Sequence, residues 1–445
     1  MSYQPIENYG IIGDLHTVAL VGLDGSIDFM CFPHFDSPTV FGALLDDDQG
    51  GRFSIAPVLG DARLKQLYLP DSNVLLSRFL SDAGVAEISD FMPVEAAGHA
   101  HMLVRRVKTV RGEVRFRLRC FPRYDYARIG HRVDIRGREA FFLPEGTWPM
   151  SLRLRSDVPL FADGPAAVAE FTLRAGETAA FVLEEAKREA SPASAPDYVS
   201  DSFKRTLHFW RRWSGRSTYR GRWREMVNRA ALVLKLLASS SYGSLVAAPT
   251  FGLPEVIGGE RNWDYRYTWI RDASFTVYAL IRLGYMEEAH AFMRWVEARC
   301  GEANGNGPLQ VMYRIDGRHD LEEKTLGHLE GYRKSSPVRI GNGAYRQRQL
   351  DIYGDLIDSA YLFDKYGEPV SSTLWEDISR LVGWVCRHWS EADEGIWESA
   401  QRPPGISALA PAVLGGGGSC PPPRPQAIVS RAGRSLASGP GRDLP

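Results

Sequence analysis

The sequence has few cysteines and no long apolar run. Its five cysteines are scattered over 445 residues and never form a CxxC pair, which argues against a disulfide framework or a cysteine zinc site. No apolar run approaches the ~18 residues that a membrane-spanning helix needs, and the opening "MSYQPIENYG" lacks the basic and apolar segments of a signal peptide. We therefore expect a cytoplasmic protein with reduced thiols, no membrane association and no metal or other cofactor.

The chain also lacks a charge excess of either sign. Its formal net charge is −1, which gives no general attraction for nucleic acid. The arginines of "VRFRLRC" (Arg115, Arg117 and Arg119) alternate with apolar residues, which is the period of a strand with one solvated face. A hydrophobic content of 44% is instead typical of a globular protein with two or three domains.

The first 190 or so residues have the signals of β structure. Short alternating runs such as "EVRFRLRCF" and "EFTLRAGETAAFVLE" are separated by turn dipeptides such as Asp24-Gly25 and Ala175-Gly176. Strands that follow strands without intervening helices indicate an antiparallel sandwich. The segment "EASPASAPD" then breaks this pattern as a linker would.

A helical period follows the linker. In "GRWREMVNRAALVLKLLASS" the apolar residues recur at i, i+3 and i+4 and predict one apolar stripe: Trp223, Met226, Val227, Ala230, Ala231, Leu234 and Leu237. In "DASFTVYALIRLG", Asp272 is placed to cap the start of a helix and Gly284 to end it. We therefore predict a β-domain over residues 1–195, a linker over 196–220 and an all-α part over 221–398.

The last segment differs from everything before it. Residues 401–445 contain nine prolines, eight glycines and no aromatic residue. Such a composition cannot bury enough apolar surface to offset chain entropy, so we expect no fixed fold from residue 399 onward.

Two clusters could bind a sugar. In "GGERNWDYRYTWIRDAS" (258–274) aromatic faces alternate with charged groups, which suits the apolar faces and hydroxyl rim of a sugar ring but also suits a buried ion-pair network. In "PVRIGNGAYRQRQLDIYGD" (337–355) polar residues precede a helix, although the glycines could serve only a turn. The polar and aromatic candidates are Trp263, Asp264, Tyr265, Arg266, Tyr267, Trp269, Arg271, Asp272, Arg339, Asn342, Gln349, Asp351 and Tyr353.

A third signal is the glutamate of "DEGIWE". Glu398 follows Trp397, and an apolar neighbour can raise the pKa of a carboxylic acid toward the value that a general acid needs at neutral pH. The alternative is that Glu398 is simply exposed.

These clusters, behind an opening "GDLHTVALVGLDGSID", resemble glycoside hydrolase family 15, the glucoamylases and bacterial trehalases. The resemblance covers residues 1–398. It implies an N-terminal antiparallel β-sandwich and an (α/α)6 barrel that hydrolyses terminal α-glucosidic bonds with inversion. It also implies that Tyr265, Trp269, Arg271 and Asp272 hold the terminal glucose and that Glu398 is the general acid. Arg339, Gln349 and Asp351 would complete the sugar site.

An inverting hydrolase also needs a carboxylate base on the opposite face of the sugar, about 6.5–9.5 Å from the acid. The segment that carries this base in the family has no match here, and residues 221–398 have room for about half of twelve helices. We therefore expect an incomplete barrel that is inactive, followed by a tail (399–445) from a shifted reading frame. The alternatives are a non-catalytic trehalose- or glucan-binding module and a product of gene decay. The substrate, the oligomeric state and any phosphate or magnesium requirement stay open.

Overall fold

The computed structural model describes residues 3–94, 101–186, 191–195, 197–302 and 308–396. The chain divides into two compact units. The first unit consists of residues 1–241, 248–266 and 323–340, and the second of residues 242–247, 267–322 and 341–445. The predicted tail, like Glu398, lies outside the described residues.

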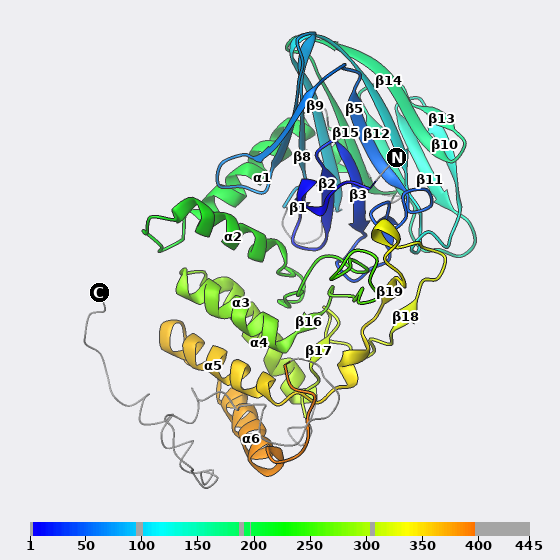
Figure 1. The fold of residues 1–445 in the computed structure, drawn as a ribbon. Helices are drawn as coiled ribbons and strands as arrows, with labels where there is room; N and C mark the ends of the chain where they lie inside the picture. The colour runs from blue at the N-terminus through cyan, green and yellow to red at the C-terminus, as the bar shows by residue number, and fades with distance from the viewer. Residues whose placement is uncertain (1–2, 95–100, 187–190, 196, 303–307, 397–445) are drawn as a thin grey trace. The chain divides into compact units, whose positions relative to one another are not determined.

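The first unit is built on fifteen antiparallel strands (Figure 1). One group of strands comprises β1 (Tyr9–Gly13), β2 (Val18–Gly22), β3 (Ser26–Cys31), β4 (Thr39–Phe41), β5 (Arg52–Pro57), β13 (Phe161–Asp163) and β14 (Ala166–Arg174). The other group comprises β6 (Arg63–Tyr68), β7 (Leu75–Leu80), β8 (Gly84–Phe91), β10 (His131–Arg136), β11 (Glu139–Pro144), β12 (Leu152–Ser156) and β15 (Thr178–Glu185).

The long strand β9 (Met102–Phe121) belongs to both groups. Its first half pairs with β8 and β15, and its second half pairs with β5 and β14. Gly112 lies where the partners change. Its φ of 79° disfavours any residue with a Cβ, and a Cβ there would come within 2.6 Å of the Ala83 carbonyl oxygen. The glycine therefore lets one strand pass from one sheet into the other.

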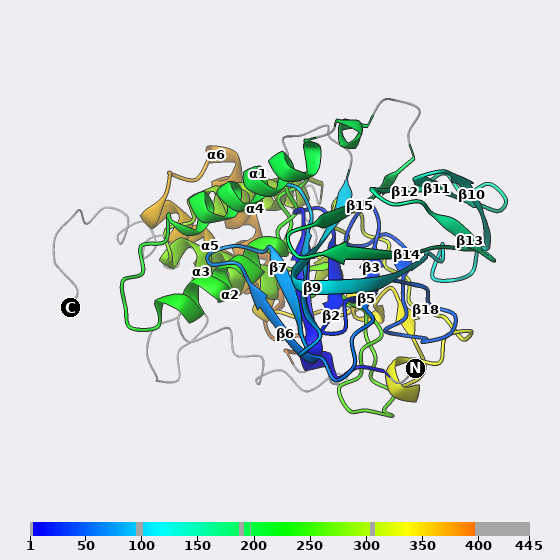
Figure 2. The same cartoon turned by 90° about the horizontal axis from the view of Figure 1, so that it is seen from above.

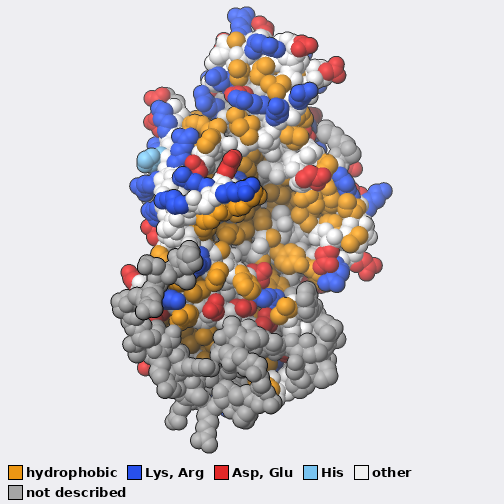
Figure 3. Space-filling model, turned by 60° about the vertical axis from the view of Figure 1, so that its left-hand side comes forward, with side chains coloured by type: hydrophobic (Ala, Val, Ile, Leu, Met, Phe, Trp, Pro, Cys, Tyr) orange, Lys and Arg blue, Asp and Glu red, His pale blue; other side chains and the backbone are white. Residues whose placement is uncertain are grey.

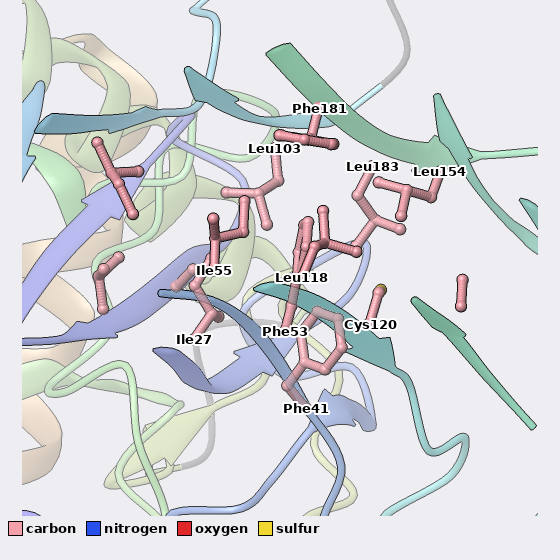
Figure 4. Packing of buried hydrophobic residues seen from close by; sticks show 14 of the residues in the cluster. Ile27, Phe41, Phe53, Ile55, Leu103, Leu118, Cys120, Leu154, Phe181 and Leu183 are labelled. Atoms are coloured by element: carbon pink, nitrogen blue, oxygen red, sulfur yellow. The ribbon is translucent and has the colours of Figure 1, made fainter. Parts of the chain in front are cut away.

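The main core lies between these two sheets. Figure 4 shows Ile27, Phe53 and Leu118 from one sheet packed with Leu103 and Phe181 from the other, and all five side chains are fully or almost fully buried. Two sheets that bury one face each against the other form a sandwich. The predicted antiparallel β-sandwich is therefore confirmed.

The arginine stretch is one strand with one wet face, as its period predicted. The apolar residues Val114, Phe116, Leu118 and Cys120 are buried in the core. The intervening arginines pair with surface carboxylates: the exposed Arg115 and Arg117 with Glu170, and the half-buried Arg119 with Asp163.

The segment predicted as a linker (196–220) instead contains helix α1 (Tyr198–Ser214). Tyr198 and Phe203 of this helix pack against Val104 of β9 and Val182 of β15. Figure 2 shows α1 beside the strands of this sheet. The Pro- and Ser-rich stretch that suggested a linker ends just before α1, and burial against the outer face of the sheet stabilises this helix.

Helix α2 (Arg224–Leu236) forms where the apolar stripe was predicted, but its buried face is different. Of the predicted stripe, Ala231 is buried, but Met226 and Trp223 are 68% and 54% exposed. Asn228 and Leu232, which lie outside the stripe, are buried. The reason is a polar docking site: the Asn228 amide donates to Asp71, and the Asn73 amide donates to the Leu232 carbonyl. The rest of the first unit contains β18 (Lys324–Thr325), β19 (Arg339–Ile340) and the 3-10 turns Ile6–Asn8, Pro192–Ser194 and Tyr332–Lys334.

The second unit is mainly helical. Its elements are β16 (Thr268–Trp269), α3 (Ile270–Arg282), α4 (Met286–Glu302), β17 (Met312–Tyr313), the 3-10 turn Gly343–Arg346, α5 (Asp351–Tyr366) and α6 (Ser372–His388). Helices α3 and α5 lie side by side and run in the same direction, because Arg271 bonds Asp351 at their starts and Arg282 bonds Tyr366 at their ends. Helix α4 follows α3 along the chain, and α6 follows α5. Parallel neighbouring helices that alternate along the chain with a second set of helices are typical of an α/α barrel.

The surface of the described residues carries both charged and apolar side chains, as one face in Figure 3 shows. In the second unit, Phe275 and Tyr278 of α3 are 62% and 44% exposed, one helical turn apart. None of the described helices is both long and apolar enough to span a membrane.

Candidate active site

The first sugar-binding cluster (258–274) divides between the two units. Asp264 and Arg266 belong to the first unit, where both side chains are fully buried and form an ion pair. Arg266 also donates to the Ser37 carbonyl and contacts Tyr126. For this pair the interpretation as a buried ion-pair network is correct, and neither side chain is exposed to a ligand.

Arg271 lies at the centre of the polar cluster in the second unit. It lies in the first turn of α3, and its Nη1 donates to Gln349 Oε1 and to Asp351 Oδ2, both at 2.7 Å. Its guanidinium also lies 5.7 Å from the centre of the Trp269 ring. The structure thus brings together four of the predicted site residues, although Arg271 and Asp351 are 80 positions apart in the chain.

The cluster has unsatisfied polar groups. Among the described residues, Asp351 Oδ1 and Trp269 Nε1 are buried and have no hydrogen-bond partner. A buried polar atom without a partner costs free energy, and a ligand hydroxyl could satisfy it. Trp269 itself is only 3% exposed, because it packs with Tyr267 and Met312. The face of its indole ring is therefore largely covered and is not exposed for stacking on a sugar in the way that the sequence suggested.

Asp272 follows Arg271 in the first turn of α3. It does not cap the helix, because α3 already begins at Ile270, but Gly284 follows its end as predicted. Burial raises the pKa of Asp272, with a smaller contribution from Asp351, while Arg271 opposes the shift. The carboxylate therefore lies in a partly dehydrated place where hydrogen bonds to charge are strong.

Asp355 is a further member of the cluster that sequence reasoning missed. It lies one turn after Asp351 on α5, and burial together with the charge of Asp351 raises its pKa to about 6. The i, i+4 spacing of two acidic residues was the signal that could have identified it. Asp358 has a pKa raised by burial alone.

Two predicted sugar-site residues belong to the first unit. Tyr265 is 36% exposed, and its backbone N–H bonds the Thr250 carbonyl. Arg339 donates to the Glu260 carbonyl, forms an ion pair with Glu323 and lies 4.8 Å from the centre of the Trp263 ring. Their role in sugar binding stays a prediction, as does that of Glu398, which lies outside the described residues.

The fold and this cluster define a protein with an antiparallel β-domain before a helical domain, which carries a buried polar cluster at the starts of α3 and α5. The chain matches the family Glycosyl hydrolases family 15 over residues 221–413 and the domain Trehalase-like, N-terminal over residues 1–193. The chain belongs to glycosyl hydrolase family 15, as the sequence resemblance indicated. The family match ends at residue 413, within the segment that the sequence predicted to be unrelated.

Known relatives agree with this membership. The chain is 35% identical to a trehalase of Mycolicibacterium smegmatis, covering 90% of this chain and 63% of the relative. It is also 35% identical to Trehalase 1 of Sulfolobus acidocaldarius, covering 88% of this chain and 67% of the relative. The chain thus spans about two thirds of the length of these relatives.

A solved structure supports the fold. A bacterial glucoamylase in complex with acarbose aligns with a TM-score of 0.63 and 13% identity, covering 90% of this chain and 61% of the glucoamylase. At this identity the likeness concerns the fold alone. It confirms the predicted fold class, a β-sandwich followed by a helical domain of the (α/α) barrel type.

Proposed function

We propose that the chain derives from an inverting hydrolase of terminal α-glucosidic bonds and that its sugar site is the cluster around Arg271. The observation that carries the proposal is the Arg271 pair with Gln349 and Asp351, beside unsatisfied polar atoms of Asp351 and Trp269. Fixed polar groups of this kind can bind the hydroxyls of one glucose unit in one orientation. Membership of family 15 supplies the reaction class.

Each residue of the cluster has a proposed role. Asp272 and Asp351 accept hydrogen bonds from sugar hydroxyls, and Arg271 holds Asp351 in place while it donates to the sugar. Bonds from a carboxylate to a sugar hydroxyl strengthen as positive charge develops on the ring in the transition state. Trp269 would contribute its indole N–H.

Glu398 is the proposed general acid that protonates the leaving oxygen. Inversion also needs a second carboxylate that removes a proton from the attacking water, on the opposite face of the sugar. Asp272, Asp351 and Asp355 form the sugar-binding cluster in this proposal and are not assigned that task. We therefore propose that these 445 residues alone do not turn over substrate.

Two observations support inactivity of the chain by itself. The relatives are longer, since this chain spans 62–63% of the two mycobacterial trehalases. On α3, the apolar side chains of Phe275 and Tyr278 are exposed, as expected for barrel helices with missing neighbours.

Trehalose is the proposed substrate. The relatives that align over 86–90% of this chain are trehalases, and the N-terminal half matches the trehalase-like domain. The glucoamylase likeness concerns only the fold and does not favour a maltodextrin.

The test is the release of glucose, followed by proton NMR to identify the first anomer formed. The purified 445-residue chain should release none from trehalose or maltose. A chain extended to the length of its relatives should release β-glucose first from trehalose, and Glu398→Gln should abolish this. Release of β-glucose by the 445-residue chain, abolished by Glu398→Gln, would overturn the proposed inactivity.

A non-catalytic sugar-binding module is the second candidate, because the Arg271 cluster is formed without the second glutamate. Equilibrium dialysis with trehalose distinguishes the two. A binding module retains trehalose in the 445-residue chain, and the extended chain also retains it without releasing glucose.

A further inference from the structure

Three histidines from separate parts of the first unit lie together. His16 lies in the turn between β1 and β2, His34 in the loop between β3 and β4, and His101 directly before β9. One ring nitrogen of each lies within 4.8 Å of a ring nitrogen of the other two. The rings of His16 and His101 are 4.5 Å apart between centroids, and those of His34 and His101 are 5.8 Å apart. All three side chains are half-buried.

This spacing is close to that of a metal site. A tetrahedral zinc ion with Zn–N bonds of about 2.0–2.1 Å holds its nitrogens about 3.4 Å apart. Small rotations of three half-buried rings would cover the difference from the present distances. The chain has only ten histidines in 445 residues, and these three come from three different segments. Three such side chains are therefore not expected to lie together by chance.

A buried carboxylate orients one of the three rings. Asp14 Oδ2 lies 2.9 Å from His101 Nδ1, and Asp14 is only 4% exposed. If Nδ1 donates this bond, the lone pair of the ring is on Nε2. A carboxylate that fixes the tautomer of a histidine in this way is the common second partner of zinc-binding histidines. The other oxygen of Asp14 accepts from the backbone N–H groups of His16 and Thr17, both at 3.0 Å, and so holds the His16 turn.

His16 also has polar partners at both ring nitrogens. Ser240 Oγ lies 2.8 Å from Nε2, and Ser241 Oγ lies 3.1 Å from Nδ1. One hydroxyl can accept the N–H of the neutral ring while the other gives way to a metal.

We propose that His16, His34 and His101 bind one divalent cation of the zinc class, with Asp14 positioning His101. Three imidazoles suit Zn²⁺, Co²⁺, Ni²⁺ or Cu²⁺, whereas Mg²⁺ and Ca²⁺ prefer oxygen ligands. The bound ion joins the β1–β2 turn, the β3–β4 loop and the start of β9. It therefore stabilises the β-sandwich, because only the folded chain brings the three ligands together. This inference does not depend on the proposed glycosidase activity.

The test uses the 445-residue chain after treatment with a chelator and dialysis. Zn²⁺ is titrated in competition with a chromophoric chelator, and Mg²⁺ is titrated calorimetrically in parallel. We expect one Zn²⁺ per chain, no Mg²⁺ at this site, and a higher Tm with Zn²⁺. Co²⁺ should give the visible absorption of a four- or five-coordinate nitrogen site.

Variants separate a built site from adventitious binding. His34→Ala should weaken Zn²⁺ at least ten-fold and remove the Tm increase, and Asp14→Asn should weaken it about 10–100-fold. The matched control is His208→Ala, an exposed histidine on α1, which should bind Zn²⁺ like the parent. The metal-free Tm of each variant shows whether it folds, and His101→Ala replaces any variant that does not.

The proposal fails if the parent chain binds no Zn²⁺, or if folded His34→Ala and His101→Ala bind it as tightly as His208→Ala does.

Discussion

Two kinds of charge cluster, one in each unit, differ in how completely their charged groups are paired. In the first unit, the sandwich buries its apolar residues between two sheets, and its buried charges are paired: Arg105 with Asp90, and Arg266 with Asp264. In the second unit, carboxylates around Arg271 have raised pKa values, and apolar side chains on α3 are exposed. Fully paired buried charges stabilise a fold, whereas carboxylates with shifted pKa values are typical of functional sites.

The largest expected effect is in the sandwich core. Phe116 on β9 is fully buried and stacks on Phe171, with ring centroids 5.3 Å apart. Phe116→Ala should lower the free energy of unfolding of the first unit by about 3–5 kcal/mol, because it removes buried surface and leaves a cavity. Denaturant unfolding followed by near-UV circular dichroism measures this. The control Phe275→Ala, on the exposed side of α3, should change little, and an equal loss in both variants would contradict the comparison.

The next effect concerns the buried ion pair of Asp90 and Arg105. Both side chains are fully buried, and Arg105 also donates to the carbonyls of Phe53 and Gly25. Asp90→Asn should cost about 3 kcal/mol, because it leaves a buried guanidinium without its counter-charge. The midpoint of urea unfolding reports the loss. Glu170→Gln, at the exposed arginine stretch, should leave the midpoint unchanged.

A smaller effect is expected at Asp272 in an active chain extended to the length of its relatives. Asp272→Ala should reduce kcat/KM about 100-fold, equivalent to about 2.7 kcal/mol of transition-state stabilisation, because a charged hydrogen bond to the sugar is lost. Steady-state kinetics on trehalose measures this. Asp358→Asn, further along α5, is the control. Unchanged kinetics for Asp272→Ala would make Asp272 a structural member of the Arg271 cluster.

The smallest effect is a pH dependence from Asp355. Its pKa in the folded chain is about 6, above the ordinary value of 3.8, so the protonated form is favoured by folding. The stability that this group contributes is fully present below pH 3.8 and is lost as pH rises through 6. At pH 7.5, Asp355→Asn should therefore be more stable than the parent by about 1 kcal/mol, a value reduced for the partial exposure of the side chain.

Thermal unfolding of parent and variant between pH 4 and pH 8 checks this. The two curves should converge near pH 4, separate between pH 4 and pH 6, and stay a constant distance apart above pH 6. Glu376→Gln, an exposed residue of α6, should follow the parent at every pH. Curves that separate at low pH would show that the sign is wrong.

Much of the fold could be predicted because periodicity reports burial. Alternation in "VRFRLRC" identified both faces of β9, and the helical period identified α2 and α3. Periodicity of apolar residues does not reveal a helix that packs through side-chain hydrogen bonds, as α2 does through Asn228 and Asp71. The buried face of α2 was therefore assigned only in part: Ala231 is buried as predicted, but Asn228 is buried where Met226 was expected. Helix α1 was missed because its start follows a Pro- and Ser-rich stretch that predicts a linker.

The candidate site was less accessible to sequence reasoning. Residue types alone left a sugar site and an ion-pair network equally open, and the structure divides the cluster: Asp264 and Arg266 form the buried pair, and Arg271 joins Gln349 and Asp351. Long-range proximity of this kind follows from helix packing and not from local spacing. The sequence resemblance predicted it, while Asp355 was missed.

The sharing of β9 between two sheets has a consequence for the order of folding. Its partners β5 and β8 precede it, but β14 and β15 follow it and extend to Glu185. During synthesis, β9 therefore leaves the ribosome with the edge that pairs with β5 and β8 covered and the opposite edge, which pairs with β14 and β15, still open. About 65 further residues must emerge before its remaining partners arrive, at a synthesis rate of about 5–20 residues per second. For several seconds this strand is the part of the nascent chain most open to mispairing, and chaperones that bind extended apolar segments have their clearest target there.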